Sequence, residues 1–514
     1  MEQQTLSDNT KRIARNTFLL YVRMLFTMAV SLYTSRVVLH VLGVNDFGIY
    51  NVVGGVVGML SILSGSLSAA ISRFITFELG KENLENLKSI FSTAINIQVL
   101  LAFCVFCLAE LVGTWFLNAK MNIDIDRLWA ANWVLHCSIL TFMVNLVSVP
   151  FNALMIAHEH MKAFAYISIL DALLKLLVVF LLQLSSWDKM IVYALLLLLV
   201  SIVIRLIYSA YCRRHFKECV YCWCFNRPLL KTMLGFAGWN FIGASSGVLK
   251  DQGVNIAINL FCGTAVNAAR AISVQVNNAI NSFVTNFMTA LNPQITKSYA
   301  KGDYYYMSKL VQQGSRLSFY LLLVLSLPVI LNAEEILTLW LRVVPAHTVL
   351  FVRLILVLAM CDALSGTLIT AMLATGRIRN YQLVVGGLQM LNFPISYLLL
   401  RLHCFPESTM IVAILISLSC LVIRLLFLRS MIDLQVMEFL RKVLVNVFLV
   451  TLVSVILPIG CFLNMPPGLL RFFTVSLVCF VCTLSSIYFI GCSPKERQYL
   501  HDKTAFFFHK IRKI

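Results

Sequence analysis

The sequence contains few charged residues. Only 12% of its 514 residues are Asp, Glu, Lys or Arg, whereas 60% are hydrophobic. Soluble globular domains contain about 45–50% apolar residues, and a chain with much less polar surface cannot keep its apolar side chains out of water. A soluble globular protein is therefore excluded, and we expect lipid to surround most of the chain.

Nucleotide-binding and metalloprotease motifs are also missing. The sequence has neither a G-x-x-x-x-G-K-[ST] loop nor an H-E-x-x-H pair, so it predicts no catalytic residues and no ATP hydrolysis.

Most of the 15 cysteines lie in apolar segments, where Cys behaves as a small hydrophobic residue. The loop between the halves contains one C-x-x-C, Cys219 to Cys222, without a second well-spaced pair in that loop, and we predict neither a metal site nor a cofactor.

Acidic residues are the rarer charge, with 23 Asp and Glu against 41 Lys and Arg and a net charge of +18. Most basic residues lie in short segments between apolar runs, where they set the orientation of a membrane protein. If the N-terminus is inside, about 26 basic residues lie inside and about six outside. We therefore expect no nucleic-acid partner, a multi-pass membrane protein and two cytoplasmic termini.

Apolar windows long enough to cross a bilayer, about 20 residues each, number about fourteen. They cover residues 16–40, 46–71, 89–117, 129–156, 163–184, 188–211, 231–261, 264–292, 309–332, 347–374, 380–401, 408–429, 442–463 and 468–491. An offset of 220 residues aligns Gly43 with Gly263 and Lys81 with Lys301, which indicates an internal duplication. We predict an N-terminal six-helix bundle (1–211), a basic cytoplasmic linker (212–230), a C-terminal six-helix bundle (231–432), two appended helices (433–491) and a basic cytoplasmic tail (492–514).

Polar residues recur at helical spacing in the first two helices of each half. In hydrocarbon such stripes indicate a face turned to the bundle interior or to water. The polar residues expected to line an aqueous cleft are Asn51, Ser61, Asp251, Asn255, Asn277 and Asn281. The alternative is that small and polar residues hold packed helices together. Because the stripes occupy related positions in both halves, we favour a cleft between the halves.

Four cations on these helices, Arg23, Arg36, Lys250 and Arg270, predict that the cleft binds an anionic group such as phosphate or pyrophosphate. Asp251 is the main acidic counterweight. Arg36 could instead reach lipid headgroups. Asp171 and Lys175 lie four residues apart in one helix and either neutralise each other or couple transport to an ion.

Two segments carry a family resemblance. Residues 35–50, SRVVLHVLGVNDFGIY, resemble the junction of helices one and two in bacterial O-antigen and capsule flippases. Asn292-Pro293-Gln294-Ile295 and the following Lys301-Gly302-Asp303 resemble the family's pattern after helix eight. These flippases are polysaccharide transporters of the multidrug/oligosaccharidyl-lipid/polysaccharide exporter superfamily.

The resemblance implies a V-shaped, all-α fold of about 14 helices with a central cleft. It also implies alternating access that moves an undecaprenyl-pyrophosphate-linked oligosaccharide to the periplasmic leaflet, for O-antigen, capsule or exopolysaccharide synthesis. The expected partners are that lipid, the bilayer and other polysaccharide assembly proteins, and the protein is expected to be a monomer. One alternative is a cation-coupled multidrug transporter of the same superfamily. The other is a membrane polymerase or glycosyltransferase, which the short loops disfavour.

Overall fold

The structure, a computed structural model, describes residues 2–58, 61–119, 125–221, 227–341, 344–494 and 496–498. Within these ranges it leaves out some side chains, mainly in residues 2–64 and 249–268. The described residues are mainly helical and contain no strand. This confirms the all-α fold predicted from the sequence.

The chain divides into two compact units. The first comprises residues 1–245 and 289–303, and the second comprises residues 246–288 and 304–514. The helices that begin in the first unit are α1 (Glu2–Gly58), α2 (Ser61–Lys81), α3 (Leu84–Ala119), α4 (Ile125–Ala157), α5 (Met161–Leu184), α6 (Lys189–His215) and α7 (Arg227–Ala300). The bundle boundaries at 211 and 231 stay predictions, since the contacts divide the chain inside α7 instead.

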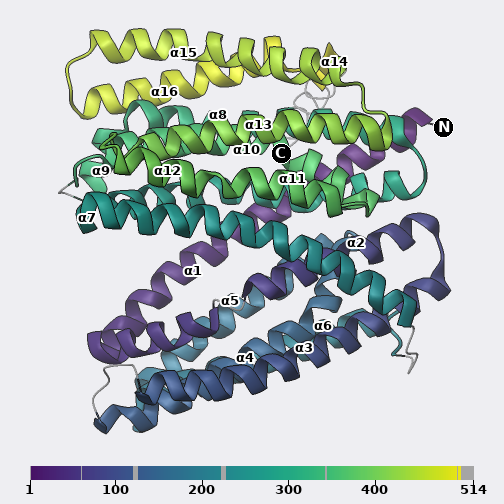
Figure 1. Cartoon of the computed structure of the whole chain (residues 1–514), viewed down its shortest axis with the longest axis vertical. Helices are drawn as coiled ribbons and strands as arrows, with labels where there is room; N and C mark the ends of the chain where they lie inside the picture. Colours follow the sequence, from purple (N-terminus) through teal and green to yellow (C-terminus); the bar gives the residue numbers. More distant parts are fainter. Residues whose placement is uncertain are drawn as a thin grey trace, which may run out of the picture. The chain divides into compact units, whose positions relative to one another are not determined.

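The second unit contains the middle of α7 and the helices that follow it (Figure 1). These are α8 (Tyr304–Leu331), α9 (Ala333–Leu341), α10 (Thr348–Thr375), α11 (Arg379–Met390), α12 (Asn392–Arg401), α13 (Ser408–Ile432), α14 (Val436–Phe439), α15 (Asn446–Asn464) and α16 (Leu469–Ser486). Two π-helical segments, Leu440–Val445 and Ile487–Gly491, flank the hairpin of α15 and α16. The hairpin contacts α8.

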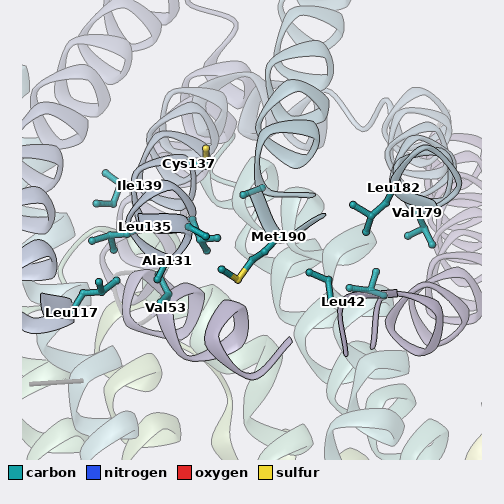
Figure 2. Packing of buried hydrophobic residues seen from close by; sticks show 14 residues of the cluster. Leu42, Val53, Leu117, Ala131, Leu135, Cys137, Ile139, Val179, Leu182 and Met190 are labelled. Atoms are coloured by element: carbon teal, nitrogen blue, oxygen red, sulfur yellow. The ribbon is translucent and has the colours of Figure 1, made fainter. Parts of the chain in front are cut away.

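Each unit has its own apolar core. In the first unit, Met190 of α6 belongs to a buried cluster with Ala131 of α4, Leu42 of α1 and Leu182 of α5 (Figure 2). In the second, Val254 and Ala269 of α7 pack with Phe351 of α10. Because lipid is as apolar as these side chains, close van der Waals packing, rather than exclusion from water, lets these clusters position the helices within each unit.

The predicted boundary between the first two helices coincides with a break at Gly43. This residue has φ 80° and ψ 168° inside α1, a conformation that favours glycine because a side chain would clash there. The second predicted window, 46–71, is divided between the end of α1 and the start of α2.

The long α7 reverses direction along its length. A straight helix would separate Phe236 from Tyr299 by about 95 Å. Both instead contact α2, because Phe236 lies 5.8 Å from Phe74 and Tyr299 lies 6.2 Å from Phe77 between ring centroids. The two legs of α7 correspond to the windows predicted at 231–261 and 264–292.

Among the described residues, ten helices are long and apolar enough to cross a membrane. The helices that carry the predicted polar stripes, α1, α2 and α7, are not among them. Other helices expose large apolar side chains, for example Phe448 of α15 and Phe473 and Leu477 of α16. Such faces fit a lipid surround, so the chain is a multi-pass membrane protein.

Candidate functional site

A polar cavity of about 520 Å³ lies within the second unit. Both legs of α7 line it, and residues of α10, α12 and α13 complete the wall. Its polar and charged lining residues are Lys250, Asp251, Asn255, Arg270, Asn277, Asn278, Asn281, Asp362, Asn392 and Thr409. The structure thus places six residues from the predicted cleft, all of them on α7, around one cavity.

Helical geometry explains why α7 contributes most of this wall. Lys250, Asp251 and Asn255 lie within two turns of the first leg, and Arg270, Asn277 and Asn281 recur at helical spacing along the second. Because both legs line the same cavity, the chain turns back between Asn255 and Arg270. The polar stripe of each leg therefore faces the same space.

Gly253 allows the first leg to approach α12 closely. A Cβ atom at this position would lie 2.7 Å from Cδ2 and 2.9 Å from Cγ of Phe393. The neighbouring Asn392 lines the cavity. The small residue in α7 therefore brings an amide of α12 into the wall, although the two residues are far apart in sequence.

Arg270 is the most strongly buried cation of the cavity. Only 7% of its surface is exposed, and its buried Nε has no hydrogen-bond partner among the described residues. The Oδ1 atom of Asn277, two turns further along the same leg, is likewise buried without a partner. A buried donor without an acceptor is costly, so an acceptor atom such as a phosphate oxygen would be stabilised at this wall.

The formal charges inside the cavity balance. Asp251 acts electrostatically on Arg270, and Asp362 of α10 lines the same space and accepts a hydrogen bond from the Ser417 hydroxyl. The Asp362 carboxylate makes the cavity neutral, whereas the net positive charge expected of the whole cleft stays a prediction.

A further cation, Arg424, lies on α13 about three turns after Ala413, the last cavity residue of that helix. Arg424 is 4% exposed, and it donates from Nε to the Tyr381 hydroxyl at 3.2 Å and from Nη1 to Ser365 Oγ at 3.0 Å. Ser365 lies one turn after the cavity residue Asp362 on α10. The positive charge of Arg424 thus adds to the field around the cavity.

Among the other predicted site residues, Arg23, Asp171 and Lys175 do not line this cavity. Arg23 lies in the first unit with its guanidinium 5.0 Å from the ring centroid of Phe164. Lys175 donates to Asp171 at 2.7 Å, with 48% and 31% of the two side chains exposed, so the pair neutralises itself while ion coupling stays untested. The side chains of Arg36, Asn51 and Ser61 lie outside the described residues, as do Cys222 and Cys224.

Four cavity residues escaped the sequence analysis: Asn278, Asp362, Asn392 and Thr409. Asp362 had a usable signal, because a carboxylate inside an apolar span is costly and commonly functional. Asn392 and Thr409 had no such signal in the sequence, since each is a single polar residue near a helix end.

The segment 243–247 has the G-x-S-x-G spacing of serine hydrolases. It lies inside α7, however, and not at the strand-to-helix turn which that motif requires.

Solved structures with the same fold are membrane transporters. A MATE transporter mutant matches with a TM-score of 0.72 and 13% identity over 83% of this chain and 96% of its own. A MOP superfamily transporter from Pyrococcus furiosus, described as having a binding pocket of reversed polarity that suggests a different function, matches with a TM-score of 0.71 and 12% identity over the same shares. An outward-facing multidrug resistance MATE transporter matches with a TM-score of 0.69 and 13% identity, again over 83% and 96%.

The fold is therefore that of the two-lobed MATE and MOP superfamily transporters. No curated protein matches the chain in sequence. The family model described as "Polysaccharide biosynthesis protein" matches residues 13–299, which is more than half of the chain. The chain belongs to this polysaccharide biosynthesis family.

Proposed function

We propose that the protein is a flippase that moves an undecaprenyl-pyrophosphate-linked oligosaccharide from the cytoplasmic to the periplasmic leaflet of the bacterial inner membrane. The product would serve O-antigen, capsule or exopolysaccharide synthesis. In this proposal the two units alternate between inward-open and outward-open states around the lipid-linked sugar, and no bond is made or broken. The family membership and the transporter fold support it.

The observation that carries the proposal is Arg270. A pyrophosphate would supply the acceptor that its buried Nε lacks, and Lys250 in the same cavity would add a second charge-assisted contact. The amides of Asn255, Asn277 and Asn281 can donate to phosphate or sugar oxygens and accept from sugar hydroxyls. A membrane polymerase or glycosyltransferase has less support, since the related structures are transporters.

A multidrug transporter is the second candidate. Asp251 and Asp362 give the cavity two carboxylates, which can attract a cationic drug as readily as the two cations attract a phosphate. The two candidates therefore differ in which charges of the cavity hold the ligand. Variants that replace either the cations or the carboxylates, but not both, distinguish the two candidates.

The first prediction is that Arg270→Ala reduces export of the lipid-linked oligosaccharide. Each charge-assisted contact contributes about 1.5–3 kcal/mol, so transport at limiting substrate should fall by about 10- to 150-fold. Arg270→Lys should restore part of the transport, because the positive charge is kept. Recovery should be incomplete, because the planar, bidentate donor geometry of the guanidinium is lost. The measurement is surface polysaccharide in a strain whose own gene is deleted, at matched levels of membrane-inserted protein.

Arg429→Ala is the matched control, because this cation is exposed, belongs to the same unit and does not line the cavity. It should leave export unchanged. Normal export in Arg270→Ala would contradict the flippase proposal. Loss of drug resistance in Asp251→Asn and Asp362→Asn, with polysaccharide intact, would establish the multidrug alternative.

A further inference from the structure

The turn between α4 and α5 is held in a strained conformation by contacts on three consecutive residues. His158 pairs with Glu218, Glu159 accepts from the end of α7, and His160 Nδ1 lies 3.1 Å from the Tyr211 hydroxyl. Glu159 has φ +59°, a left-handed conformation that is uncommon for a residue with a side chain. The neighbouring contacts therefore preset the direction of the Glu159 carboxylate.

Glu159 anchors the last turns of α7 inside the first unit. Its Oε1 accepts from Lys297 Nζ at 2.8 Å and from Gln294 Nε2 at 2.6 Å. Only 1% of the Glu159 side chain and 21% of the Lys297 side chain are exposed. Loss of one partner from such a buried ion pair is strongly unfavourable, so these two bonds make a specific attachment.

His160 does not disturb this attachment near neutral pH. Burial lowers the pKa of His160, and the neighbouring His158, His215 and Lys297 act in the same direction. The imidazole is therefore mainly neutral when the surroundings are neutral, and it does not repel Lys297. Glu159 is then the charged group of the turn that faces the end of α7.

A second contact brings the same segment against α2. A Cβ atom at Gly80 would lie 2.6 Å from Ala300 Cβ and 3.0 Å from the Lys297 carbonyl oxygen. Only glycine permits so close an approach without displacement. Together, Glu159 and Gly80 hold residues 294–300 from two sides.

The segment 294–300, which we call the docked segment, belongs to the same helix as the cavity wall. Residues 289–303 belong to the first unit and residues 246–288 to the second, so α7 leaves the docked segment and runs directly into the wall that contains Asn281 and Arg270. Pro293 lies inside α7, close to this change of unit. Proline removes a helical hydrogen bond and allows the helix to bend.

We propose that Glu159 and Gly80 form a releasable latch for residues 294–300, through which α7 transmits ligand occupancy of the cavity to the first unit. Release frees the end of α7 to bend at Pro293, and re-engagement fixes it again. The latch rests on the contacts above, whereas its role in transport rests on the proposed function. The attachment and its role are therefore tested separately.

The second prediction concerns the attachment and needs no substrate. Hydrogen exchange of the purified protein in nanodiscs should show at least about tenfold faster exchange for residues 294–300 in Glu159→Gln and in Gly80→Ala, because each variant removes one side of the latch. Lys297→Arg should keep exchange slow, since it conserves the charge. Glu82→Gln and Gly65→Ala are the controls, because Glu82 forms a 3.8 Å pair with Lys301 at the exposed surface and a Cβ at Gly65 meets nothing within 4 Å.

The role in transport is tested by locking the segment. Cysteines at Glu82 and Lys301, joined by a short thiol-reactive bridge in a background without other cysteines, should stop export, and reduction of a cleavable bridge should restore it. Unchanged exchange in both Glu159→Gln and Gly80→Ala would overturn the latch. Export at the normal rate by the bridged protein would overturn its role in transport and leave the Arg270 result unaffected.

Discussion

The cavity wall depends on one missing side chain at Gly253. This residue allows α7 to lie against the ring of Phe393, and the adjacent Asn392 then faces the cavity together with Asn255 of α7. The contact involves Cβ and Cγ of Phe393 as well as the ring edge. Rotation of the ring alone therefore cannot make room for a larger residue.

The third prediction is that Gly253→Ala destabilises the protein by about 1–3 kcal/mol, which is typical of overpacking. The unfolding temperature in detergent should fall, and the fall should be smaller when Phe393→Ala is already present, because the clash is then absent. Gly247→Ala in the same helix is the control, since a Cβ at Gly247 meets nothing within 4 Å. Equal effects of Gly253→Ala with and without Phe393 would exclude this packing account.

At the scale of elements, polar contacts fasten the hairpin of α15 and α16 along α8. Arg316 of α8 donates to both carboxylate oxygens of Glu496 at 2.6 and 2.7 Å. Asn332, just after α8, donates to Ser476 of α16 at 3.2 Å, and Arg471 pairs with Glu335 of α9. The two helices predicted as an appendix are thus specifically attached to the second unit.

The fourth prediction is that Glu496→Ala loosens this attachment. It leaves the Arg316 guanidinium, whose side chain is 11% exposed, without its carboxylate, at a cost of about 1–3 kcal/mol. The double variant Arg316→Met with Glu496→Ala should recover much of the loss, because no unpaired charge remains. Limited proteolysis between α14 and α16 and the unfolding temperature in detergent measure the effect, and identical values for the single and double variants would contradict it.

At the scale of the whole molecule, the alternation of basic segments sets the orientation in the membrane. Clusters such as Arg213 with Arg214 and Lys510 with Arg512 lie on segments that the positive-inside rule assigns to the cytoplasm. The ten apolar spans found in the described part of the chain and the transporter fold show a multi-pass membrane protein. They are compatible with this orientation without testing it.

The fifth prediction is that reporter fusions after Tyr211 and after Ile514 both report a cytoplasmic location. A periplasmic reporter fused after Tyr211 should be inactive, and a cytoplasmic reporter at the same place should be active. A fusion after Trp187, between two spans, is the control and should give the opposite result. A periplasmic signal from Tyr211 or Ile514 would require an odd number of crossings before that point.

By itself, the sequence determined that lipid surrounds most of the chain and that the fold is helical. It also determined which face of each leg of α7 is polar. Low charge and apolar windows require lipid and helices, and a period of 3.6 residues places Arg270, Asn277 and Asn281 on one face. The break at Gly43 also followed from the sequence, because it lies in a junction between two apolar windows. These properties depend on composition and on neighbours within a few turns.

Only the tertiary structure decided which helices face one another. Asp362 and Thr409 enter the cavity because α10 and α13 pack beside α7. Glu159 meets Lys297 although 138 positions separate them in the chain. Local periodicity says which face of a helix is polar, whereas the partner of that face depends on how side chains from distant segments pack together.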